Sequence, residues 1–210
     1  TPGEDLPVRR IDRILAFMSL GLVIVSIVCF FVVIIARPAG VEDDKTLRFA
    51  LRSDGDSGFL FIAWHQPHLP LAHYQKAQFR VRLDDRDVEL PSRPVDVPAG
   101  TLARWPLRLY GLDYVTATAL TVLPGPTPTL VLLADEGIPV EYAVNGTVVS
   151  VTPGLTPVRA EGANVDLLVL PASVAGQVWV NEDGPARRVL LSADELRWGP
   201  DGKVSAHTSE

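Results

Sequence analysis

The sequence predicts a mainly β protein: one N-terminal transmembrane α-helix, followed by an extracytoplasmic β-sandwich-like domain or by two small β subdomains. Two observations lead to this fold class. Residues 14–36 form an unbroken apolar stretch, and residues 46–198 contain many short apolar or alternating runs with turn signals about every 8 to 12 positions. Helical periodicity is scarce in the second region, which therefore favours strands.

The apolar stretch 14–36 predicts a membrane-spanning helix. Its 23 residues include no charge and no proline, and Arg13 and Arg37 flank it. At about 1.5 Å per residue the helix is about 34 Å long, enough to cross a hydrocarbon core of about 30 Å. A cleaved signal peptide has a shorter apolar core of about 7–15 residues. A buried helix that is apolar on every face needs a large protein around it. We therefore expect a signal anchor that stays in the bilayer.

Charges beside the span predict its orientation. Three arginines precede it within residues 1–13, whereas Arg37 alone follows it before an acidic run. Lys and Arg close to a span favour the cytoplasmic side. We expect residues 1–13 to be a cytoplasmic arm, residues 37–45 a connector and residues 46–198 an extracytoplasmic domain. In a bacterium this is a single-pass protein of the inner (cytoplasmic) membrane with a periplasmic domain.

Composition narrows the function classes. The chain carries 25 acidic and 19 basic residues, and residues 1–13 hold three of each, which leaves 22 acidic and 16 basic residues beyond the span. No basic patch is visible, so we expect no nucleic-acid partner. The single cysteine, Cys29, lies in the span, and the exported domain therefore has no disulfide. A domain of about 165 residues can bury enough apolar surface without one.

The predicted span has a face on which a second helix could pack. Small residues let helices approach closely, and serine hydroxyls can bond across the interface. A serine can instead bond back to a carbonyl of its own helix, and both interpretations stay open. The predicted helix-packing face comprises Ala16, Ser19, Val23, Ser26, Cys29 and Val33.

The β region begins with a predicted hairpin. Residues 46–52 alternate apolar and polar side chains, residues 53–58 are typical of a turn, and residues 59–64 form a buried strand. The face expected to be buried on the first strand carries Leu47, Phe49 and Leu51. Further strands are expected at residues 78–83, 88–97 (a proline-punctuated edge), 102–109, 114–123, 129–134, 139–144, 147–151, 165–170, 177–181 and 188–191.

Turn signals organise the second half of the chain. Asn145-Gly146 predicts a type I′ hairpin, because both positions need positive φ. The proline-rich residues 124–128 are either a loop or a boundary between two small domains. Residues 192–196 have a capping-box pattern and predict one helical turn. The tail of residues 199–210 is polar and has no packing pattern.

One loop stands out as a candidate site. Its three histidines could ligate a metal, its aromatic residues could contact a partner, or the loop could simply pack. The expected interaction loop contains Trp64, His65, His68, His73 and Tyr74. Asp54 and Asp56 superficially resemble a calcium loop, but a third ligand and the closing glutamate are missing. We expect no metal and no cofactor.

The sequence contains no Gly-x-Ser-x-Gly, no Ser-x-x-Lys and no exported cysteine, so we expect no catalytic residues and no enzyme. The leading hypothesis is a non-catalytic accessory subunit of a larger membrane complex, such as a photosynthetic or respiratory assembly. Its partners are then the lipid bilayer and other transmembrane subunits. The alternatives are an extracytoplasmic module that binds a saccharide or peptide, and a transient assembly factor.

Overall fold

The computed structural model describes residues 43–83, 86–181, 187–199 and 203–207. The chain divides into two compact units, residues 1–43 and 44–210. Within the described residues, no helix has the length and apolar character needed to cross a membrane. The predicted arm, the predicted span with its packing face and most of the connector lie outside the described residues.

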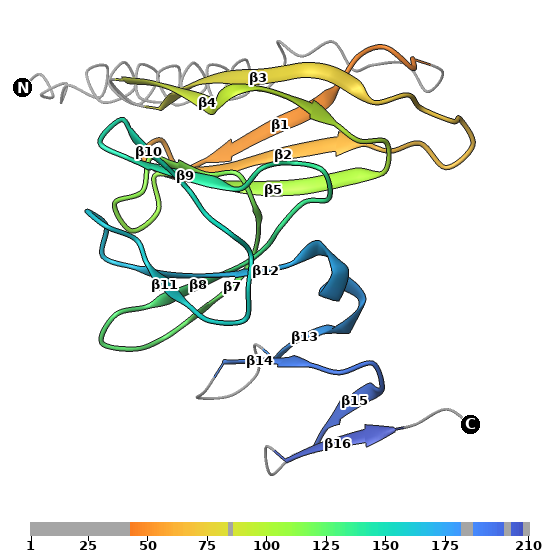
Figure 1. Ribbon diagram of the computed structural model, residues 1–210, viewed down its shortest axis with the longest axis vertical. Helices are drawn as coiled ribbons and strands as arrows, with labels where there is room; N and C mark the ends of the chain where they lie inside the picture. Colours follow the sequence, from red (N-terminus) through yellow and green to blue (C-terminus); the bar gives the residue numbers. More distant parts are fainter. Residues whose placement is uncertain (1–42, 84–85, 182–186, 200–202, 208–210) are drawn as a thin grey trace, which may run out of the picture. The chain divides into compact units, whose positions relative to one another are not determined.

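The second unit is mainly β (Figure 1). Its strands are β1 (Arg48–Ser53), β2 (Gly58–Trp64), β3 (Tyr74–Leu83), β4 (Arg86–Val97), β5 (Thr101–Leu107), β6 (Tyr114–Val115), β7 (Thr118–Leu123), β8 (Thr129–Leu133), β9 (Glu141–Val144), β10 (Thr147–Ser150), β11 (Val158–Arg159), β12 (Asp166–Leu170), β13 (Val178–Asn181), β14 (Arg188–Leu191), β15 (Glu195–Trp198) and β16 (Val204–His207). A short 3-10 helix, η1 (Ala172–Gln177), precedes β13.

The described strands form several sheets. The largest has the order β1-β2-β5-β6-β9-β10, and a four-stranded sheet has the order β11-β12-β8-β7. The pairs β3–β4, β13–β14 and β15–β16 are two-stranded. The prediction of a mainly β domain is therefore confirmed for the described residues.

The predicted first hairpin is confirmed. β1 and β2 pair antiparallel from Arg48 opposite Ala63 to Ser53 opposite Gly58. In the turn, a carboxylate oxygen of Asp54 accepts hydrogen bonds from the backbone N–H groups of Asp56 (3.2 Å) and Ser57 (2.8 Å). These bonds lower the pKa of Asp54, with the bond from Ser57 as the largest cause. The carboxylate thus closes a turn, as its sequence predicts.

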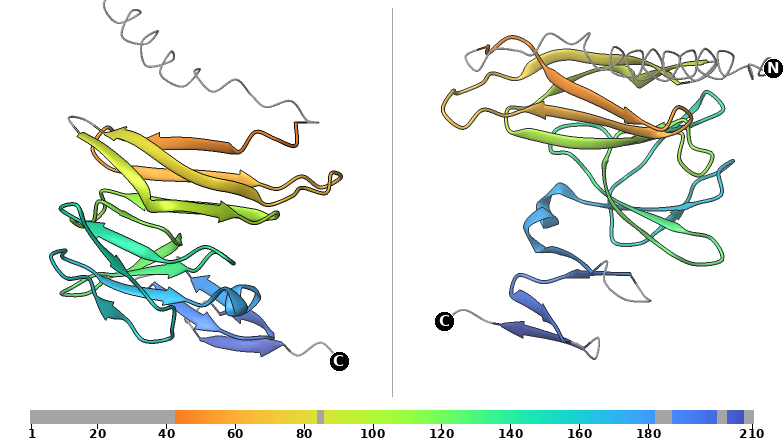
Figure 2. Two further views of the ribbon diagram at one scale, coloured as in Figure 1. Left: turned by 45° about the horizontal axis from the view of Figure 1, so that its top comes forward. Right: turned by 180° about the vertical axis from the view of Figure 1, so that it is seen from behind.

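The hairpin β3–β4 packs over β1, β2 and β5 (Figure 2). Alternate side chains of β3 and β4 point inward, which follows from the two-residue period of a strand. One cluster buries them against the sheet and includes Leu60, Ile62, Trp64, Phe79, Val81, Leu83, Leu90 and Trp105. This first core contains both fully buried tryptophan rings, Trp64 and Trp105.

A second core lies between the four-stranded sheet and the β6–β9 part of the large sheet. Its buried side chains include Val115, Leu130, Leu132, Tyr142, Val144, Leu167 and Val169. β8 and β12 pair parallel here, and their alternate apolar residues face this core. The six-stranded sheet therefore contributes to both cores.

The predicted strand 114–123 is wrong as a single strand. The chain leaves the large sheet after Val115 and joins the four-stranded sheet at Thr118. Between them, the Thr116 hydroxyl donates to the carbonyl oxygen of Pro139 (2.9 Å) and accepts from the backbone N–H of Glu141 (2.9 Å). These bonds fix the point at which the chain crosses from one sheet to the other, and β-propensity alone does not reveal this crossing.

The two turn signals of the second half have clear outcomes. β7 and β8 pair antiparallel across residues 124–128, so the proline-rich segment is a hairpin loop between paired strands. The Asn145-Gly146 hairpin is confirmed, with φ of 49° and 78° at these residues. Gly146 also donates its backbone N–H to a carboxylate oxygen of Asp113 at 2.8 Å.

Two predictions at the C-terminal end are wrong. Residues 192–196 do not form a helical turn, because Ser192 Oγ accepts the backbone N–H of Asp194 (3.1 Å) and Glu195 begins β15. The polar tail contains β16, which pairs antiparallel with β15. Strand pairing between these segments replaces the local helical preference. The predicted strands around 177–181 and 188–191 are confirmed as β13 and β14.

Candidate functional site

The predicted interaction residues lie in the loop between β2 and β3 and at the two strand ends that flank it, and Trp64, which ends β2, belongs to the core. Trp64 is only 2% exposed. Its indole Nε1–H donates to the carbonyl oxygen of Ala72 at 2.7 Å, and its ring meets Tyr74 edge-on with centroids 5.5 Å apart. The ring of Trp64 is therefore part of the core and fastens the loop to β2, whereas partner contact by the rest of the loop stays a prediction.

The histidines of this loop lie on the surface. His65, His68 and His73 are all exposed. Across the part of the chain that the structure describes, no group of three or more His, Cys, Asp or Glu side chains could hold a metal ion. The metal interpretation therefore gains no support from the described residues, and a role of the three rings in partner contact stays a prediction.

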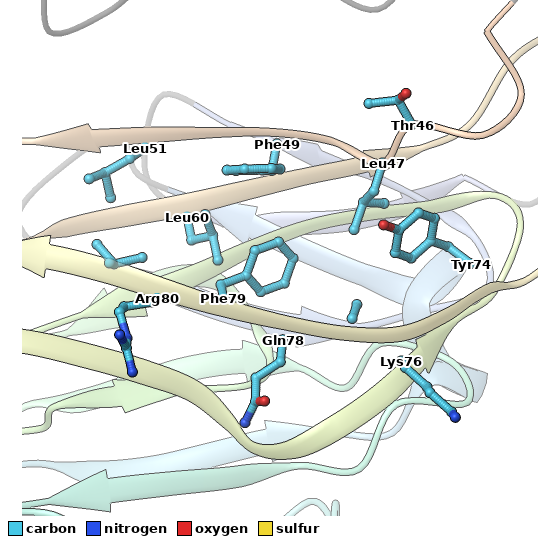
Figure 3. A pocket seen from close by; sticks show the side chains of 12 residues that line it. Thr46, Leu47, Phe49, Leu51, Leu60, Tyr74, Lys76, Gln78, Phe79 and Arg80 are labelled. Atoms are coloured by element: carbon cyan, nitrogen blue, oxygen red, sulfur yellow. The ribbon is translucent and has the colours of Figure 1, made fainter. Parts of the chain in front are cut away.

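A groove opens between β1 and β3, and we call it the β1–β3 groove (Figure 3). Its volume is about 450 Å³, within the usual range of about 300–1,000 Å³ for ligand sites. The apolar part of its lining comprises Leu47, Phe49, Leu51, Leu60, Tyr74, Ala77, Phe79 and Val81, and the polar part comprises Thr46, Lys76, Gln78 and Arg80.

The groove exists because β1 is incompletely covered. Leu47, Phe49 and Leu51 all line it, as their alternation predicts. Leu47 is buried, but Phe49 is 53% exposed and Leu51 is 40% exposed. The Phe49 ring meets only the edge of Phe79, with centroids 5.4 Å apart. The predicted inward face is therefore correct, whereas its predicted burial is wrong for two of three residues.

The two strands that border the groove are basic. β1 and β3 contain five basic residues and no acidic residue, although acids outnumber bases over the whole chain. Two of the five pair with β4: Arg80 with Glu89 at 3.3 Å and Arg82 with Asp87 at 3.9 Å. β1 contributes Arg48 and Arg52, and β3 also contributes Lys76. The groove thus combines an apolar floor with a basic border.

A partly buried carboxylate joins β5 to the four-stranded sheet. Asp135, just after β8, accepts hydrogen bonds from Trp105 Nε1–H and from the Thr118 hydroxyl, each at 2.7 Å. Burial raises the pKa of Asp135, and the two bonds partly oppose this rise. Each oxygen accepts one of these hydrogen bonds, so the carboxylate links β5 to the strands of the second sheet. The local sequence gives no signal for this role, because Trp105 and Thr118 lie 30 and 17 positions away along the chain.

A second carboxylate joins β4, β6 and β9. Glu141 accepts the backbone N–H of Ser92 (2.5 Å), the Ser92 hydroxyl (2.7 Å) and the Tyr114 hydroxyl (2.8 Å). Burial raises the pKa of Tyr114, and the neighbouring Glu141 raises it further. The Ser92 hydroxyl donates to the Glu141 carboxylate, and none of these partners is a histidine that could act as its general base. This arrangement resembles a structural clasp more than an activated nucleophile.

The Asp54 turn likewise offers no cation site. Asp54 uses its oxygens within the turn, and Asp56 pairs with Arg108 at 2.7 Å. The carboxylates of Asp54, Asp135 and Glu141 therefore bond within the fold, whereas the β1–β3 groove leaves apolar surface open. No protein-family model, no curated protein and no solved structure matches this chain, so its function has to be argued from its own residues.

Proposed function

We propose that this protein is a non-catalytic, single-pass accessory subunit of a larger membrane complex. Residues 14–36 anchor it in the bilayer, with residues 1–13 on the cytoplasmic side. The sandwich-like β domain lies on the extracytoplasmic side and binds a partner subunit. The observation that carries the proposal is the β1–β3 groove, where Phe49 and Leu51 expose apolar surface at the edge of the largest sheet.

Exposed apolar side chains are costly unless something covers them. Fully burying a phenylalanine or leucine side chain contributes about 1.5–3 kcal/mol. Phe49 and Leu51 adjoin one another on the same face of β1, so a single partner could cover both. Contiguous apolar surface with a polar rim is typical of interaction sites.

The membrane part of the proposal rests on the sequence. The apolar stretch is long enough to span a bilayer, and its small residues provide a face for another helix. That face comprises Ala16, Ser19, Val23, Ser26, Cys29 and Val33. Other transmembrane subunits and the lipid itself are the expected partners, and a respiratory or photosynthetic complex is the proposed kind of host.

Native extraction tests this proposal. The full chain is tagged, extracted from its own membrane in a mild detergent and sized by native electrophoresis, with haem and pigment absorbance recorded. We expect it to migrate in a large particle. Migration as a free chain of 22.8 kDa contradicts the proposal. Recovery in the large particle only during its biogenesis identifies the assembly-factor alternative.

A paired variant links the result to the groove. Phe49→Glu combined with Leu51→Glu should release the chain from the particle, because two charges replace the exposed apolar surface. Val148→Glu combined with Val149→Glu is the matched control on β10, where both side chains are similarly exposed. If both variants stay in the particle, the groove is not the contact.

The groove also favours a second candidate, a module that binds a saccharide or a peptide. Phe49, Tyr74 and Phe79 bring aromatic rings to the lining of a cavity of ligand size. Thermal-shift measurements on the full chain with oligosaccharides and peptides separate the two candidates. Stabilisation by a saccharide, with no large particle on native extraction, favours this second function.

A further inference from the structure

We propose that the β1–β3 groove accepts an extended segment of the partner as an added strand beside β1, and that this segment alternates apolar and acidic residues. The inference rests on the proposed function, because it names the chemistry of the partner. β1 ends the six-stranded sheet and pairs with β2 alone among the described strands. The edge of such a strand can pair with one more extended chain.

The apolar half of the segment follows from the groove. Successive side chains of a strand point to opposite faces, and directly opposed residues of paired strands lie on the same face. Phe49 and Leu51 on one face of β1, and Leu47 just before the strand, line the groove. Alternate residues of an added strand would project over this face and towards Phe79 and Val81 of β3. Apolar side chains there would cover Phe49 and Leu51, which are the exposed part of the lining.

The acidic half follows from the opposite face of β1. Arg48 and Arg52 alternate with the apolar residues, so they share that second face. The remaining side chains of the added strand would lie beside them, and opposite charges at such positions stabilise strand pairing. Lys76 adds positive charge at the β3 side of the groove, whereas the charge of Arg80 is paired with Glu89. A segment that alternates apolar and acidic residues would place its apolar side chains over the groove and its acidic side chains on the face of Arg48 and Arg52.

Peptide binding to the full chain tests the inference. The chain is reconstituted in phosphatidylcholine nanodiscs, and fluorescence anisotropy follows a labelled ten-residue peptide that alternates valine and glutamate. A peptide with lysine in place of glutamate is the matched probe. We expect the acidic peptide to bind at least about tenfold more tightly, and its affinity to fall about tenfold between 50 and 500 mM salt, because exposed charges are screened.

Two charge-reversal variants locate the site. Arg52→Glu combined with Lys76→Glu should weaken binding of the acidic peptide about tenfold or more. Arg93→Glu combined with Arg187→Glu makes the same change in net charge away from the lining and should leave the affinity unchanged. All four side chains are exposed, so folding should survive in both variants. Equal weakening by both variants means that binding reports net charge alone, which overturns the inference.

One further outcome overturns it by identifying another occupant. A dimer of the free chain that Phe49→Glu with Leu51→Glu dissolves would mean that a second copy fills it. Synthetic peptides keep this test separate from the proposed function: peptide binding by a chain that extracts as a free 22.8 kDa species supports the groove and contradicts the accessory-subunit role.

Discussion

Asp135→Ala is expected to lower the free energy of unfolding by about 2 kcal/mol at pH 7. The carboxylate accepts one hydrogen bond from Trp105 Nε1–H and one from the Thr118 hydroxyl, each at 2.7 Å. Trp105 is fully buried, so its indole N–H would lose its acceptor. A buried donor without a partner costs about 1–3 kcal/mol.

The magnitude is a difference between two effects. Hydrogen bonds to a charged group each contribute about 1.5–3 kcal/mol, and Asp135 has two. Burial of the ionised carboxylate, which raises the pKa of Asp135, offsets part of this gain. A net loss of about 2 kcal/mol corresponds to a fall in melting temperature of about 4–8 °C for a domain of this size.

Urea unfolding of the full chain in detergent, followed by tryptophan fluorescence, provides the assay. Glu136→Ala is the matched control, because Glu136 is the next residue, carries the same charge and is exposed. We expect the control to change the free energy of unfolding by less than about 0.5 kcal/mol. Equal midpoints for the two variants would refute the assignment of Asp135 as the fastener between β5 and the four-stranded sheet.

Three further outcomes follow from the same structure. Burial raises the pKa of Asp135 above 3.8, so the folded state holds the carboxyl proton more tightly than the unfolded state does, and the free energy of unfolding should fall as pH rises from about 4 through the folded pKa. Asp135→Asn should flatten this part of the plot of urea midpoint against pH. An unchanged slope in that variant contradicts the assignment. Gly146→Ala should cost about 1–2 kcal/mol in thermal unfolding, since φ is +78° and no atom obstructs the added methyl group. Gly154→Ala, equally open and without positive φ, should cost less than half as much, and equal losses would exclude backbone strain as the cause. Glu141→Ala should cost about 1–3 kcal/mol in urea unfolding because it removes the acceptor of both Ser92 donors, whereas Ser92→Ala removes one bond and should cost clearly less.

The sequence predicted best the features that are encoded locally. Asn145 and Gly146 are adjacent, and their tolerance of positive φ is sufficient to specify the tight turn between β9 and β10. The hairpin of β1 and β2 follows similarly from two apolar runs and the short polar turn containing Asp54. Neither feature depends on what the rest of the chain does.

Features that depend on distant partners were not predictable. The step between β6 and β7 is held by Thr116 through bonds to Pro139 and Glu141, which lie more than 20 positions away. Ser192 and Glu195 carry a capping-box pattern, but pairing between β15 and β16 uses Glu195 as a strand residue. In both cases tertiary hydrogen bonding overrode a local preference.

The candidate site was predictable only in part. Alternation identified the face of β1 that carries Phe49 and Leu51, but the pattern could not show that β3 leaves these side chains partly open. Aromatic content drew attention to Trp64, although a large apolar ring with one N–H donor is as well suited to a core. Whether an apolar face is covered is a property of the packed sheets and not of one strand.

Labelling from outside the cell tests most directly the claim that the β domain is extracytoplasmic and anchored by residues 14–36. His68→Cys places a thiol on the exposed β2–β3 loop, in a chain whose native Cys29 is replaced by serine. A membrane-impermeant maleimide is applied to intact spheroplasts and, in parallel, to lysed ones. The account predicts full labelling of the membrane-bound chain before lysis. Labelling only after lysis would contradict it.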